Sequence, residues 1–118
     1  MKRFLAVYLG SSQAFERSGW NALSDAERES RQRAGIAAWH RWVEANRPSI
    51  VENGGPLGKT KRVSQAGIED THNALAAYTV VTAESQEAAA ELFVGHPHFT
   101  IFPGEAVEIM ECLPVPST

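Results

Sequence analysis

The segment His96-Pro97-His98 places two histidines on either side of one proline. A histidine titrates near neutral pH, so either ring could transfer a proton or bind a ligand. The proline fixes its own backbone angle and so restricts the relative directions of the two rings. A closed zinc site takes about four ligands, more than this segment supplies, so we predict an acid/base pair without a metal. The alternative is a polar connection at a helix end, where an imidazole bonds the last free carbonyls.

A third histidine, His40, lies on the apolar side of a predicted helix. Ile36, Trp39 and Val43 occupy the other positions of the same stripe, at helical spacing. A lone histidine there is usually a hydrogen-bonded core residue. The alternative is a ring that points into a pocket, with Trp39 and Trp42 as its walls. We retain His40 as a candidate catalytic residue and the two tryptophans as candidate ligand-binding residues.

A glycine-rich turn over residues 54–58 leads into the basic residues Lys59, Lys61 and Arg62. Its ending resembles that of a phosphate-binding loop. However, Asn53 stands where the opening glycine belongs, and no helical pattern follows, which argues against nucleotide binding. We predict that Lys59 and Lys61 anchor a small anionic organic ligand. The alternative is a solvated edge that discourages aggregation between sheets.

The composition is that of an ordinary globular protein, and we expect one domain over residues 1–118. The chain has a net charge of −3, which favours neither nucleic acid nor an anionic membrane as a partner. No apolar run is long enough to span a bilayer or to serve as a signal peptide, so a cytoplasmic protein is expected. Cys112 is the only cysteine, which excludes a disulfide and multi-cysteine metal motifs, and we expect a buried or half-buried thiol. No cofactor is expected.

The elements that must position these residues alternate between strand and helix. Phe4 to Leu9 is apolar on both faces, which is typical of a central strand covered on both sides. Ser24 and Glu27 fit a capping box, and the helix that they begin should end near Asn46, before a proline. The further expected elements are a strand over 50–53, a loop or irregular hairpin to residue 73, a strand over 75–81, a helix begun by Ser85 and ended at Gly95, and a strand over 107–113.

This order predicts an α+β protein with a ferredoxin-like β-α-β-β-α-β arrangement, with two crossover helices on one face of an antiparallel sheet. The other face would then be apolar and uncovered. A second copy that packs sheet against sheet would cover it, so we predict a homodimer through the open sheet face.

Several of these segments together resemble the YCII-like family, which includes the DGPF-type proteins. They are the turn over residues 54–58, the strand over 77–82, the helix from Ser85, the His96-Pro97-His98 segment and the strand over 107–110. The resemblance covers most of the chain and is best from Gly54 onward. It implies a ferredoxin-like fold in a dimeric α/β barrel.

Some members of that family carry a histidine-aspartate pair in a cleft, and one branch resembles dehalogenating or lactone-handling enzymes of aromatic breakdown. Where those relatives have Asp-Pro after the second helix, this chain has His96-Pro97. Their first-helix histidine falls several residues before His40. Only His96 therefore occupies a matching motif position.

Two functions remain open at this point. The first is a small-molecule enzyme or binding protein with a histidine-containing pocket between helix and sheet. The second is a non-catalytic dimeric module that regulates or scaffolds a partner. An apolar pocket that contains a histidine would favour the first, and a filled interior with His96 exposed would favour the second.

Overall fold

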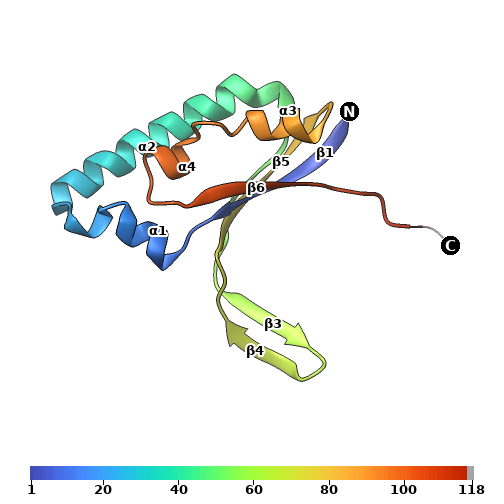
Figure 1. Cartoon of the computed structure of the whole chain (residues 1–118), viewed down its shortest axis with the longest axis horizontal. Coiled ribbons are helices and arrows are strands. Elements are labelled where there is room, and N and C mark those ends of the chain that lie inside the picture. The colour runs from blue at the N-terminus through green and yellow to red at the C-terminus, as the bar shows by residue number, and fades with distance from the viewer. Residues whose placement is uncertain (117–118) are drawn as a thin grey trace.

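The computed structural model describes residues 1–116 and shows helices packed against one face of a four-stranded sheet (Figure 1). A separate two-stranded hairpin projects from the sheet. The elements in chain order are β1 (Lys2–Leu9), α1 (Ser12–Arg17), the 3-10 turn η1 (Trp20–Ala22), α2 (Asp25–Asn46), the 3-10 turn η2 (Arg47–Ser49), β2 (Ile50–Pro56), β3 (Thr60–Ser64), β4 (Gly67–Thr71), β5 (Leu75–Ala83), α3 (Gln86–Glu91), α4 (Pro97–Thr100) and β6 (Ala106–Glu111).

The main sheet has the strand order β2-β5-β1-β6, and each neighbouring pair is antiparallel. The expected α+β class with an antiparallel sheet is therefore confirmed, as is the central position of β1. In the register of β1, Ala6 lies between Thr79 of β5 and Ile109 of β6. Side chains alternate across a strand, so the residues of β1 divide into two sets, one on each face of the sheet.

The helices cover the face that carries Phe4, Ala6 and Tyr8, all of which are fully buried. Tyr8 and Thr79 share a hydrogen bond of 3.0 Å between their hydroxyl groups, which satisfies both groups inside the core. Burial of this apolar layer is the main source of stability. The core comprises Phe4, Ala6, Tyr8, Val81, Ala83, Ala89 and Phe93, with Trp39 and Trp42 of α2 packed against it.

The long helix α2 begins as its sequence predicts. The Ser24 hydroxyl accepts a hydrogen bond from the Glu27 amide, and the Glu27 carboxylate accepts one from the Ser24 amide. This capping box satisfies two amides that have no partner within the helix. The helix ends at Asn46, and Pro48 lies in the 3-10 turn that follows. No helix within residues 1–116 has both the length and the apolar character needed to cross a membrane.

None of the helices in the described part of the chain covers the opposite face of the sheet (Figure 1). Leu5 and Val7 of β1 are half-buried there, and Leu5 pairs with Val80 of β5 and Met110 of β6. Met110 is 42% exposed. The uncovered face that the sequence predicts is present in the chain. Glu108 of β6, opposite Val7, adds an exposed charge to its apolar residues.

The polar segment between β2 and β5 forms a regular hairpin, β3 with β4, rather than a loop. We call this projecting hairpin the arm. It pairs with no other strand of the described chain and leaves the body of the molecule near the ends of β2 and β5 (Figure 1).

Several expectations from the sequence were wrong. The helix begun by Ser85 ends at Glu91 and not at Gly95. The segment after β1 is not a loop but contains α1 and η1, and the Ser11 hydroxyl caps α1 by accepting from the Ala14 amide. The second strand does not stop at Asn53 but continues to Pro56. Cys112 is exposed, because β6 ends at Glu111 and the chain then leaves the sheet (Figure 1).

Candidate functional site

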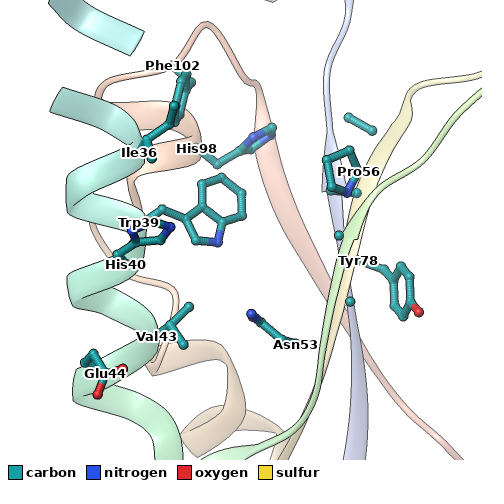
Figure 2. A pocket seen from close by; sticks show the side chains of 14 residues that line it. Ile36, Trp39, His40, Val43, Glu44, Asn53, Pro56, Tyr78, His98 and Phe102 are labelled. Atoms are coloured by element: carbon teal, nitrogen blue, oxygen red, sulfur yellow. The ribbon is translucent and has the colours of Figure 1, made fainter. Parts of the chain in front are cut away.

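A cavity of about 550 Å³ opens between α2 and the strands β2 and β5, on the helix-covered side of the sheet (Figure 2). Most of its lining is apolar. The residues that line it are Ile36, Trp39, His40, Val43, Glu44, Asn53, Gly54, Gly55, Pro56, Ala76, Ala77, Tyr78, His98 and Phe102. A concave, mostly apolar site with a few polar groups is the usual form of a small-molecule pocket.

The walls of the cavity follow from two local features of the chain. On α2, the stripe of Ile36, Trp39 and Val43 lines the cavity; Trp39 also contacts the core, whereas Ile36 is 51% exposed. On β2, Gly54 has a φ of +65°, and a side chain at this position would collide with the carbonyl of Tyr78. Only glycine adopts this conformation readily. Gly54 therefore lets β2 bend close against β5 at the cavity wall.

His98 is the ionisable group that lies deepest in the lining. It is 8% exposed, and its Nε2 lies 2.7 Å from the carbonyl oxygen of Leu9. A carbonyl can only accept, so Nε2 carries the proton and Nδ1 keeps a free lone pair. Burial lowers the pKa of His98, and the bond to Leu9 partly opposes that shift. The ring is therefore neutral at pH 7 and offers a proton acceptor.

The loop after α4 also shapes the position of this ring. A side chain at Gly104 would collide with the imidazole of His98, and the Gly104 amide donates to the His98 carbonyl at 3.0 Å. Phe102 packs over Gly35 of α2, where a side chain would likewise collide with the phenyl ring. The two glycines thus permit the close approach of His98 and Phe102 to the cavity wall.

His96 does not line the cavity. It is fully buried, and its Nδ1 accepts a hydrogen bond of 3.0 Å from the His98 amide, so its ring caps the N-terminus of α4. The proton of the neutral ring is then on Nε2, which is buried without a hydrogen-bond partner in the described chain. The rings of Trp39 and Trp42 lie 4.5 and 4.7 Å away between centroids. Desolvation by burial, followed by the nearby His98, lowers the pKa of His96 to about 4.

Two polar groups face the cavity opposite the histidine. Figure 2 shows the indole of Trp39 projecting into the cavity with its nitrogen on the side of Asn53. The side chain of Asn53 points toward the same space. Tyr78, although its backbone borders the cavity, directs its side chain away from α2, and its hydroxyl donates to Glu52 at 2.6 Å. The cavity therefore has an acceptor at His98 and N–H groups near Trp39 and Asn53.

The remaining predicted site residues are divided between several places. His40 is exposed and lines the cavity from α2, beside Trp39. Trp42 lies against the core instead, where its indole nitrogen donates to the Leu92 carbonyl at 2.7 Å. Lys59 and Lys61 line a second hollow of about 600 Å³ at the base of the arm. Thus the structure brings together Trp39, His40 and His98, and it separates them from His96, Trp42 and the two lysines.

Asn53 and Phe102 are lining residues that the sequence did not single out. Asn53 carried no pattern, because a polar residue beside a glycine pair reads as part of a turn. Phe102 stands between α4 and β6, in a segment with no strand or helix periodicity. Within residues 1–116 there is no group of three or more His, Cys, Asp or Glu side chains placed to hold a metal ion.

No protein-family model matches the sequence, and no curated protein matches it either. A solved structure with a similar fold is that of 5-chloro-2-hydroxyhydroquinone dehydrochlorinase from Burkholderia phenoliruptrix AC1100, in complex with 2,5-dihydroxybenzoquinone. The two structures match with a TM-score of 0.51 and 14% sequence identity, over 92% of this chain and 90% of that chain. At this level of identity the likeness shows a shared fold and nothing finer.

Proposed function

We propose that this protein binds a small, planar organic molecule that carries a hydroxyl group, in the cavity between α2 and the β2–β5 edge. His98 accepts the hydroxyl proton through Nδ1. The observation that carries the proposal is the ring of His98, held in one tautomer by the Leu9 carbonyl and placed in the lining of an apolar cavity. A positioned neutral imidazole is the usual general base at pH 7.

The shape and polarity of the cavity support this class of ligand. Trp39 and Phe102 supply flat apolar surfaces, against which a planar ring can stack. A ligand hydroxyl near His98 would donate to Nδ1, while an oxygen at the far end would accept from the N–H groups of Trp39 and Asn53. The dehydrochlorinase of similar fold holds a hydroxylated quinone, which agrees with such a ligand.

A proton transfer in this cavity would involve only the ligand hydroxyl group and the ring of His98. The O–H bond of the ligand breaks as the Nδ1–H bond of His98 forms, which leaves an imidazolium beside a ligand oxyanion. Conjugation through a planar ring spreads the negative charge toward the donors near Trp39 and Asn53. Because burial lowers the pKa of His98, the imidazolium readily returns its proton. His98 therefore suits a transient exchange of protons.

The alternative of a purely regulatory or scaffolding module receives less support. A filled interior with His96 exposed would favour it, whereas His96 is buried and a histidine-containing cavity is open. We also propose that the fold is of the ferredoxin-like, dimeric α/β-barrel type, with two copies packed through the uncovered face around Leu5 and Val80. The half-buried apolar side chains of that face support this arrangement. The anion-anchoring role of Lys59 and Lys61 stays a prediction, and it would place the anion outside this cavity.

Hydroquinone is a suitable probe, because it is planar and its hydroxyl groups stay protonated at neutral pH. We expect hydroquinone, kept reduced, to shift the NMR signals of the Trp39 indole and the Asn53 side chain. In Val43→Trp, a larger side chain fills the cavity from α2 and should abolish those shifts. Ala45→Trp places the same residue on an exposed position of α2 and should leave them unchanged. Absence of shifts at millimolar hydroquinone, or equal shifts in Val43→Trp, would refute the proposal.

A further inference from the structure

Within residues 1–116, no strand pairs with the outer edge of β6. β6 ends the strand order of the main sheet, and the Cys112 amide bonds inward to the Arg3 carbonyl. In an antiparallel pair the inward and outward groups alternate, so the backbone groups of Val107, Ile109 and Glu111 point outward. The carbonyl of Ile109 already receives a hydrogen bond from Gln86, which confirms that direction. The other outward groups are open to a further strand.

An apolar groove runs beside this edge. It has a volume of about 300 Å³ and lies between β6 and the segments that contain α3 and α4. Val94 is 80% exposed and Phe99 38% exposed along it. Three acidic residues lie in this region: Glu105 lines the groove, and Glu108 and Glu111 lie on β6 itself. Arg17 of α1 already pairs with Glu105 at 3.8 Å, so Glu108 and Glu111 are the main acidic groups offered to a partner strand.

Among the described residues, unpaired strand edges also occur on β2, at the other end of the main sheet, and on the arm. Its two strands carry opposite charges: β3 contains Lys61 and Arg62, and β4 contains Glu69 and Asp70. Each basic side chain forms an ion pair with an acidic one across the hairpin. Both ion pairs are exposed and therefore stabilise the arm only weakly.

The arm also carries two apolar side chains that are largely exposed. Val63 and Ile68 face each other across the hairpin and are 74% and 72% exposed. A hairpin of two strands is marginally stable in water unless it packs against something else. The arm therefore has both the free edge and the exposed apolar pair of a strand that docks elsewhere.

We propose that β3 of the arm pairs with the outer edge of β6 in a second copy of this chain, and that the two copies exchange arms reciprocally. Each main sheet then gains two strands from the other copy. A strand added to an exposed edge gains its affinity from main-chain hydrogen bonds and its specificity from alternate side chains.

The charges decide which edges pair. Pairing of β3 with a second β3 would bring Lys61 and Arg62 against their own copies. Pairing of two β6 edges would do the same for Glu108 and Glu111. Like charges opposite one another destabilise a sheet, and opposite charges stabilise it. Of the pairings that use these two edges, only β3 with β6 joins a basic strand to an acidic one.

The alternation of side chains fits the same arrangement. Lys61 and Val63 share one face of β3, and Arg62 is on the other. When Val63 faces the apolar groove, Lys61 lies on the side of Glu105 and Glu111. Arg62 then lies on the opposite side of the sheet, which is the side of Glu108.

The topology indicates that the strand added to β6 comes from a second copy and not from the same chain. The arm connects β2 to β5 at one edge of the main sheet, and β6 forms the opposite edge. The arm therefore lies at the far edge of the sheet from the β6 of its own chain. A two-fold axis brings the arm of each copy to the β6 edge of the other, which closes the assembly as a dimer.

A charge-swap variant of the arm tests the proposal. The changes Lys61→Asp, Arg62→Glu, Glu69→Arg and Asp70→Lys keep both ion pairs and the net charge but make β3 acidic. We expect sedimentation equilibrium to show a discrete wild-type dimer and at least a tenfold weaker dimer for the swap variant. Adding Glu108→Lys and Glu111→Lys to the same chain should restore the affinity, since the charges again oppose each other.

The control places the β6 changes alone in the wild-type background, where they should weaken the dimer as the swap does. Circular dichroism should show an intact fold in each variant. A swap variant that dimerises as tightly as wild type would overturn the proposal. The proposal would also be overturned if the variant with all six substitutions failed to regain affinity. A wild-type monomer at micromolar concentration, or an open-ended series of larger assemblies, would overturn it too.

Discussion

The backbone amide of His98 donates a hydrogen bond to Nδ1 of His96, 3.0 Å away. This contact gives the two histidines of one short motif different tasks. His96 is buried inside the protein, where its side chain caps α4 among the rings of Trp39, Trp42 and Tyr8. The cap fixes the start of the helix from which His98 extends into the cavity lining. His96 is thus a positioning residue, and His98 is the group that a ligand can reach.

Acid should destabilise the protein through His96. Its pKa is about 4 in the folded chain and about 6.5 when unfolded, so between these values the unfolded state binds a proton that the folded state does not. The stability contributed by the neutral ring is present above pH 6.5 and is lost as the pH falls to about 4. The loss is on the order of 3 kcal/mol. His96→Asn retains a capping oxygen but cannot titrate, so its free energy of unfolding should vary less with pH over that range.

Chemical denaturation at a series of pH values measures this difference. His96→Asn also leaves a smaller side chain in the core, so the variant should be less stable than wild type at pH 7. The prediction concerns the slope with pH, not that offset. Equal slopes for the two proteins between pH 6.5 and 4 would show that the ring of His96 is not held neutral by burial.

Phe93 should be among the most costly side chains to remove. It is 3% exposed and packs against Trp42 and Tyr8. Phe93→Ala should lower the free energy of unfolding by about 3–5 kcal/mol, because the cavity that it leaves cannot collapse fully. The neighbouring Val94 is 80% exposed, so Val94→Ala serves as the control and should change stability by less than about 0.5 kcal/mol. Similar losses in both variants would mean that this core is wrongly placed.

The uncovered face of the sheet should respond to a buried charge. Val80 lies opposite Leu5 on that face, so Val80→Glu would place a carboxylate between two packed sheets. Light scattering should then show a dimer at least tenfold weaker than that of wild type, whereas Ala37→Glu, on an exposed position of α2, should dimerise as wild type does. A dimer of unchanged affinity in Val80→Glu would contradict packing through this face.

Local patterns predicted the elements of the fold well. The capping box at Ser24 and Glu27, the cap at Ser85 and the two-sided apolar character of β1 each depend on neighbours in the sequence. The short helix α1 was missed because its six residues carry no full apolar stripe. The arm was left as a loop or irregular hairpin, because its residues are almost all exposed and give no burial pattern.

The candidate site could be predicted only in part. The sequence singled out Trp39, His40 and His98 for their types, but it could not show which of the two histidines beside Pro97 would reach a cavity. That choice depends on contacts across the chain, such as Leu9 with His98, which are 89 residues apart. Trp42 shares a helix with Trp39 yet turns toward the core, where the Leu92 carbonyl accepts its N–H group.

The affinity for hydroquinone, relative to that for 1,4-dimethoxybenzene, tests the central claim most directly. The two molecules share a planar ring, but only hydroquinone can donate a hydrogen bond to Nδ1 of His98. Wild type should bind hydroquinone about tenfold more tightly, as one additional hydrogen bond implies. His98→Phe retains an aromatic ring without an acceptor and should bind the two molecules equally, with its fold checked by circular dichroism. An unchanged preference for hydroquinone in His98→Phe would contradict the assignment of His98 as the proton acceptor.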